Sequence, residues 1–208
     1  MPLKNSSMRY GAISQSIHWL TVVLVIVLLL TGNFGHVEAD EPQSALYMWH
    51  GSLGVLVLLL VVARVLWRFA SPPPELPASM SAAARWLAKA FHVAFYALLV
   101  ALPVTGWLVA SKEGSPVNFF GVASLPRWEF QVTAAPGPQP AAADEERNEH
   151  REGPPGRRHE ENIFEELHEV LGNVLLVLAI LHLLAGLKHH FIDRDDVLKR
   201  MLPASGTK

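Results

Sequence analysis

The stretch HWLTVVLVIVLLLTG, residues 18–32, decides the fold class of this protein. It belongs to a longer window, residues 10–37, that contains no Asp, Glu, Lys or Arg. About 20 apolar residues in a helix cross the hydrocarbon core of a bilayer, so the window is long enough for one membrane span. Its apolar residues surround the helix on all sides, which is typical of a helix in lipid and not of a soluble bundle.

Three further windows lack charged residues, namely 42–63, 90–111 and 170–187. The last is the shortest and becomes long enough when its charged neighbours extend their side chains towards the membrane surface. We therefore predict one domain over residues 1–208, an all-α integral membrane four-helix bundle. The predicted spans are 12–35, 46–68, 87–110 and 166–189. The first span lacks a small-residue cleavage pattern, so we expect it to be retained and not removed as a signal peptide.

The charges of the connecting segments predict an orientation. Basic residues gather in the amino-terminal segment, in the second connection and in the tail, where they include Lys4, Arg9, Arg64, Arg68, Arg85, Lys188 and Arg194. The first connection contains HVEADEPQ, with three acids and no base. The positive-inside rule then predicts an inner-membrane protein with both termini in the cytoplasm. The insertion at 131–162 is rich in Pro, Ala, Glu and Arg, and we expect it to be external and disordered.

Composition excludes several kinds of site. The chain has no cysteine, so it holds no disulfide, iron–sulfur cluster or thioether-linked haem. Its net charge of −2 argues against a nucleic-acid partner.

Among the ten histidines, the predicted helices carry His18, His50, His92, His168 and His182. Ionisable side chains at membrane depth are rare and usually functional. His168 and His182 are 14 residues apart, which separates them by about 21 Å along the helix with about 40° of rotation. One helix face therefore presents imidazoles at an outer and an inner level. His50 matches the outer level, and His18 matches the inner level. His92 lies near the inner surface.

This arrangement of imidazoles favours haem over zinc. Zinc takes four protein ligands, or three and a water, whereas haem iron takes two axial histidines and brings its own four nitrogens. We predict two haem groups, one held by His50 and His168 and one by His18 and His182.

Glycines near these histidines leave room for a macrocycle. Gly32 follows His18 by 14 residues and shares its helix face at the outer level, and Gly54 and Gly172 lie within about a turn of a predicted ligand. Arg64 lies on the ligand face of its helix at the inner level, where a guanidinium can pair with a haem propionate. The alternatives are that the glycines serve helix contacts and that Arg64 only sets the orientation.

Several motifs together resemble the bacterial cytochrome b561 family, which is related to the cytochrome b subunits of hydrogenases and formate dehydrogenases. They are ISQSIHWL, YMWHGSLG, HVAFYALLVALPVTGW, ELHEVLGNV and LHLLAGLKHHFIDRDDVLKRMLP. The resemblance implies a four-helix membrane cytochrome with two b haems that exchanges electrons with a quinone, and its ligand pattern agrees with the pairing above. Some relatives are superoxide oxidases. A superoxide site should be positively charged, whereas the predicted outer surface here is acidic, so a periplasmic redox protein stays open as the outer partner.

The inner surface is the predicted quinone site. His92, Lys188 and His189 lie near its level, and imidazoles suit the proton transfer that accompanies quinone reduction. The alternative is that the run from Lys188 only anchors the helix to lipid headgroups. A rival function for the whole chain is a non-redox proton or ion relay, or a metal transporter, that uses the membrane histidines.

Overall fold

The computed structural model describes residues 2–34, 45–76, 80–128 and 163–202, and it confirms four helices that are long and apolar enough to span a membrane. They are α1 (Ala12–Phe34), α2 (Ala45–Ala70), α3 (Ala82–Lys112) and α4 (Ile163–Phe191). The predicted bounds agree to within a few residues. The largest difference is at α3, which begins five residues before the predicted span because the Ser81 side chain accepts a hydrogen bond from the backbone N–H of Ala84 and caps the helix.

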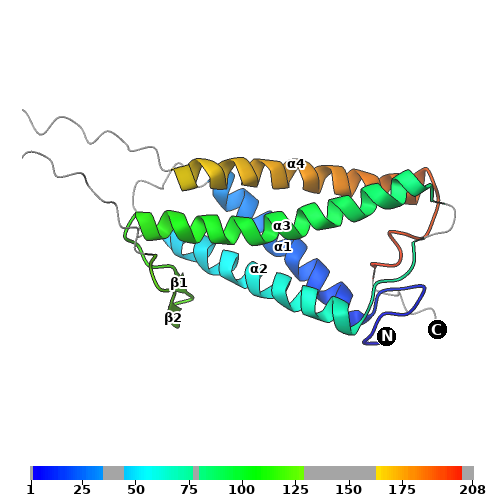
Figure 1. The fold of residues 1–208 in the computed structure, drawn as a ribbon, viewed down its shortest axis with the longest axis horizontal. Helices are drawn as coiled ribbons and strands as arrows, with labels where there is room; N and C mark the ends of the chain where they lie inside the picture. The colour runs from blue at the N-terminus through cyan, green and yellow to red at the C-terminus, as the bar shows by residue number, and fades with distance from the viewer. Residues whose placement is uncertain (1, 35–44, 77–79, 129–162, 203–208) are drawn as a thin grey trace, which may run out of the picture.

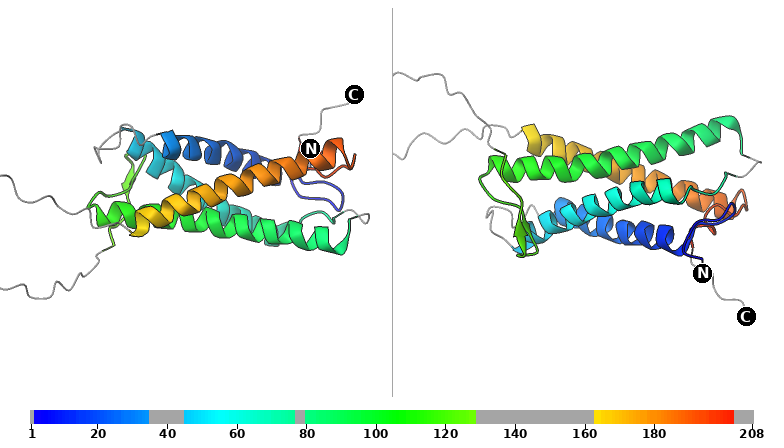
Figure 2. Two further views of the ribbon diagram at one scale, coloured as in Figure 1. Left: turned by 90° about the horizontal axis from the view of Figure 1, so that it is seen from above. Right: turned by 60° about the horizontal axis from the view of Figure 1, so that its bottom comes forward.

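The helices lie lengthwise beside one another, and the segment before α1 and the segment after α4 lie at the same end of the bundle (Figures 1 and 2). Helix α1 packs on α2, α2 on α3, and α3 on α4, with the most extensive contact between α3 and α4. Helices α1 and α4 are not among the closely packed pairs, and neither are α2 and α4. Side chains of α4 that meet side chains of α1 or α2 therefore do so through the interior of the bundle.

A small apolar layer fills the middle of the bundle. Its buried centre is Leu24 of α1 with Val57 and Val61 of α2. Leu24 lies between His18 and Gly32 in the sequence, so the layer separates the two predicted levels. Many other large apolar side chains of the helices are exposed, as expected for a surface that meets lipid.

A short hairpin follows α3 and departs from the purely helical prediction. Strand β1 (Asn118–Phe119) pairs antiparallel with β2 (Ala123–Ser124). The Ser52 hydroxyl of α2 donates to the Asn118 carbonyl over 2.7 Å and accepts from the Phe120 N–H over 3.0 Å. The hairpin is therefore fixed to the bundle at the turn that follows His50. The insertion at 131–162 lies outside the described residues.

The opposite end of the bundle joins three segments that the charge pattern had placed on one side. Trp19 donates its indole N–H to the Met201 carbonyl (3.0 Å), and Arg9 donates to the Lys199 carbonyl (3.1 Å). Arg200 reaches the connection between α2 and α3, where it donates to the Glu75 carbonyl (2.6 Å). The segments before α1 and after α4 thus share one side of the bundle.

Candidate functional site

The structure brings His50 of α2 and His168 of α4 together. Their ring centroids are 6.1 Å apart and their planes are inclined by 70°. Two imidazoles that bind one metal from opposite sides have centroids about 6.3 Å apart, given metal–nitrogen bonds of about 2.0 Å and the radius of each ring. The spacing of the two rings therefore suits one iron between them.

A cavity of about 750 Å³ surrounds this pair. Both histidines line it, together with the three glycines predicted to lie beside a haem, Gly32, Gly54 and Gly172. A Cβ atom added at Gly54 or Gly172 would meet no protein atom within 4 Å, and one added at Gly32 would lie 3.6 Å from Cε1 of His50. The glycines thus border open space beside the imidazoles, where a flat macrocycle fits.

Two threonines hold these imidazoles, and the sequence reasoning missed both. Nδ1 of His50 lies 2.9 Å from the Thr31 hydroxyl, and Nδ1 of His168 lies 3.0 Å from the Thr105 hydroxyl. It also missed Gly106, where an added Cβ would lie 3.2 Å from Cε1 of His168. A signal was present, since the dipeptide Thr-Gly occurs twice in the chain, once in α1 and once in α3.

The inner level holds three histidines. The centroids of His92 and His182 are 6.1 Å apart with an interplanar angle of 84°. His18 lies within electrostatic reach of both, and of Arg64. Nδ1 of His92 lies 2.6 Å from the Ala88 carbonyl of its own helix. His18 and His182 thus lie near one another at the inner level, with His92 beside His182.

Arg64 lines a small polar pocket at this level, of about 30 Å³. Tyr10, Arg68, His92 and Tyr96 line it as well, and Arg64 donates to the Tyr96 hydroxyl over 3.3 Å. Burial raises the pKa of Tyr10, while Arg68 and Arg64 act in the opposite direction. Two guanidinium groups make the pocket suitable for a small anionic group.

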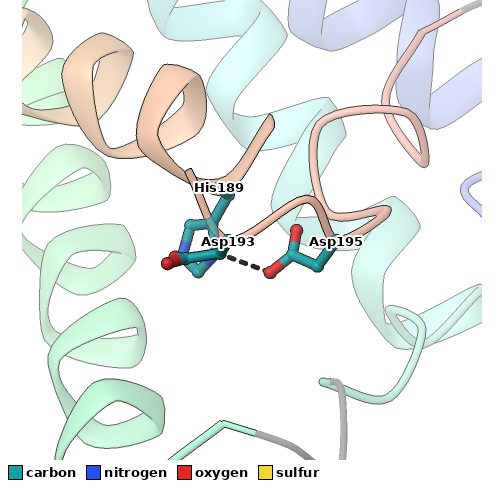
Figure 3. A group of neighbouring side chains, drawn as sticks. All are labelled: His189, Asp193 and Asp195. Atoms are coloured by element: carbon teal, nitrogen blue, oxygen red, sulfur yellow. Dashed lines mark hydrogen bonds and ion pairs between the residues drawn. The ribbon is translucent and has the colours of Figure 1, made fainter. Parts of the chain in front are cut away.

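Lys188 and His189 pair with aspartates that follow α4. Nζ of Lys188 lies 2.6 Å from Asp193, and this ammonium holds the pKa of Asp193 below its ordinary value. Nδ1 of His189 lies 2.6 Å from Asp195 (Figure 3). Within the described residues no hydrogen bond or ion pair joins either side chain to His92. His189, Asp193 and Asp195 are close enough to bind a cation, but Lys188 already neutralises Asp193, so we assign no metal to them.

Comparison with known proteins agrees with this architecture. A family profile described as prokaryotic cytochrome b561 matches residues 9–204. The chain belongs to this cytochrome family. It is 34% identical to cytochrome b561 homolog 2 of Escherichia coli (strain K12), over 100% of this chain and 98% of that one. It is 26% identical to the probable superoxide oxidase CybB of Yersinia pestis, over 94% and 96% of the two chains.

This b561 cytochrome is thus a bacterial membrane cytochrome b that functions in electron transport. Family membership implies haem b. The facing imidazoles of His50 and His168, and the glycine-lined cavity beside them, fit that group. The rival prediction of a non-redox relay or transporter has no support from the family.

Proposed function

We propose that this cytochrome binds two b haems and transfers electrons between a partner at the outer face and a quinone at the cytoplasmic face of the bacterial inner membrane. His50 and His168 hold the outer haem in this proposal, and His18 and His182 hold the inner one. The observation that carries it is the pair of facing imidazoles on one open cavity. Each haem supplies reversible one-electron transfer when it is bound.

The packing of the helices favours His18 over His92 as the second inner ligand. His92 and His182 belong to α3 and α4, which form the most extensive helix contact. Closely packed helices have axes only about 8–10 Å apart, which leaves too little room between them for a macrocycle with two axial imidazoles. His18 and His182 belong to α1 and α4, which do not pack closely, and the same holds for the helices of the outer pair.

This leaves His92 for the quinone. His92 lines the polar pocket that also contains Arg64 and Tyr96, next to His182. In our proposal its imidazole exchanges the proton that accompanies quinone reduction, while Arg64 stabilises an inner propionate. Lys188 and His189 lie beyond this pocket at the headgroup level, where they pair with Asp193 and Asp195. The basic residues at this end of the bundle support its cytoplasmic location.

Two different observations each favour one candidate electron donor at the outer face. The similarity to a probable superoxide oxidase makes superoxide one candidate. Glu165 and Glu169 line the outer cavity. Because carboxylates repel an anion, they favour the second candidate, a neutral or cationic donor such as a periplasmic redox protein.

The test begins with purified protein in detergent. We expect two haems per chain, and we expect His50→Ala and His168→Ala to remove the same haem. His189→Ala, outside both ligand sets, is the matched control and should keep both. A ratio of one haem, or loss of different haems in the two variants, would contradict the ligand assignment.

Electron transfer is tested on the same preparation. Reduced protein mixed with a ubiquinone analogue should be reoxidised within the time of a stopped-flow record. Reduction by enzymatically generated superoxide, abolished by superoxide dismutase, would identify superoxide as the donor. Reduction by a cationic redox protein that weakens with added salt would identify the second candidate. Failure of the quinone to reoxidise either haem would overturn the proposed acceptor.

A further inference from the structure

The two Thr-Gly pairs make the same contact with the two outer histidines. In α1, the Thr31 hydroxyl lies 2.9 Å from Nδ1 of His50, and a Cβ added at Gly32 would lie 3.6 Å from Cε1 of the same ring. The threonine thus meets a ring nitrogen, and the glycine lies beside the adjacent ring carbon.

The second pair repeats this contact on the other side of the bundle. In α3, the Thr105 hydroxyl lies 3.0 Å from Nδ1 of His168, and a Cβ added at Gly106 would lie 3.2 Å from Cε1 of that ring. Each imidazole is thus contacted by the helix that packs closely on the helix carrying it. Helix α1 contacts His50 of α2, and α3 contacts His168 of α4. The repetition makes a chance contact a poor explanation.

The direction of these hydrogen bonds follows from the number of protons. The Thr31 hydroxyl donates to the Val27 carbonyl one turn earlier in α1 (2.9 Å), as buried helical threonines do. Its single proton is then used, so its oxygen accepts from Nδ1–H of His50. Thr105 likewise donates to the Leu102 carbonyl (3.0 Å). With the hydroxyl protons on the helix carbonyls, both rings carry their own proton on Nδ1, and the lone pair of Nε2 is free for a metal.

We propose that the Thr-Gly pairs at 31–32 and 105–106 are two clamps that set the tautomer and the ring orientation of His50 and His168 toward the outer haem. The threonines are positioning residues in this inference, which rests on the proposed outer ligand pair. An N–H donated to an acceptor makes an imidazole a stronger electron donor to its metal, and loss of such a partner typically costs a metal site 10–100-fold in affinity.

The test replaces each hydroxyl by a methyl group of similar size. We expect Thr31→Val and Thr105→Val to shift the midpoint potential of the outer haem to more positive values, because each leaves a weaker donor to the ferric iron. We expect the affinity of the protein for its outer haem, measured by haem transfer to apomyoglobin, to fall about 10-fold. The highest g value of the outer ferric haem should also change, since the angle between the axial ring planes sets it and the ring is no longer held.

Matched variants separate the hydroxyl from the packing. Thr31→Ser and Thr105→Ser keep the hydroxyl and should restore the potential and the g value to nearly those of the parent. Thr21→Val is the control, because Thr21 makes the same kind of bond to a helix carbonyl, that of Ile17 (2.7 Å), at the inner level. If a valine variant does not accumulate, the serine and alanine variants at that position answer the same question.

Two results would overturn the clamps. Valine variants that behave as Thr21→Val does in all three measurements would show that the hydroxyls do not act on the ligands. Serine variants that shift as far as the valine variants would assign the effect to the lost methyl contact. If His50→Ala and His168→Ala do not remove one shared haem, the proposed ligand pair fails; if they do and the threonine variants are silent, only the clamps fail.

Discussion

Gly106→Ala should weaken the binding of the outer haem far more than Gly32→Ala. The added Cβ at Gly106 would lie 3.2 Å from Cε1 of His168, whereas the one at Gly32 would lie 3.6 Å from Cε1 of His50. Carbon atoms in favourable contact are about 3.5–4.0 Å apart. The His168 ring must therefore move by roughly 0.3 Å or more to accept the methyl group. The His50 ring can stay in place.

The magnitude follows from this difference. Forcing an extra methyl into a packed site costs about 1–3 kcal/mol. If this cost falls on the displaced ligand, Gly106→Ala should lower the affinity for the outer haem by about 5–150-fold. Gly32→Ala makes an ordinary contact, and we expect a change within about 0.5 kcal/mol. Both changes replace a helical glycine by alanine, so the difference between their haem affinities reports mainly the ring contact.

The assay is haem transfer from the purified cytochrome to apomyoglobin, followed at a wavelength that separates the two haems. Gly106→Ala should release the outer haem faster and at a lower apomyoglobin concentration than Gly32→Ala, with the inner haem unchanged in both. Equal release from the two variants would refute the contact argument. Selective loss of the inner haem in Gly106→Ala would refute the assignment of His168 to the outer level.

Three further predictions test the rest of the site. Gly172→Leu should reduce outer haem content without loss of folded protein, because a Cβ here meets no protein atom and the side chain would extend into the cavity; unchanged haem content by pyridine haemochrome assay would place the macrocycle elsewhere. His18→Ala should remove the inner haem, while His92→Ala should keep both haems and slow their reoxidation by quinone in stopped flow; the reverse result would make His92 the ligand. Arg64→Ala should shift the inner haem midpoint potential to more negative values in a redox titration, because a nearby positive charge disfavours the ferric state, whereas the exposed Arg85→Ala should leave it unchanged.

The hairpin after α3 shows where the sequence carried little information. Its strands have only two residues each, and no alternation of apolar and polar residues can be recognised over so short a stretch. What holds it is the buried Ser52 hydroxyl, 66 residues earlier than Asn118 in the chain. A contact at such a separation leaves no periodic trace in the sequence.

The sequence by itself determined the four spans and the two levels of histidine. Both are properties of a single helix: an uncharged window measures its length against the bilayer, and the fixed pitch of 3.6 residues per turn converts the 14-residue spacing from His168 to His182 into a depth and a face. Tertiary structure alone decided which helices pack closely and that His92 lies beside His182. It also decided that the two Thr-Gly pairs contact the imidazoles of His50 and His168. These contacts depend on the rotation of each helix about its axis and on its neighbours, and both are set by side-chain packing between segments far apart in the chain.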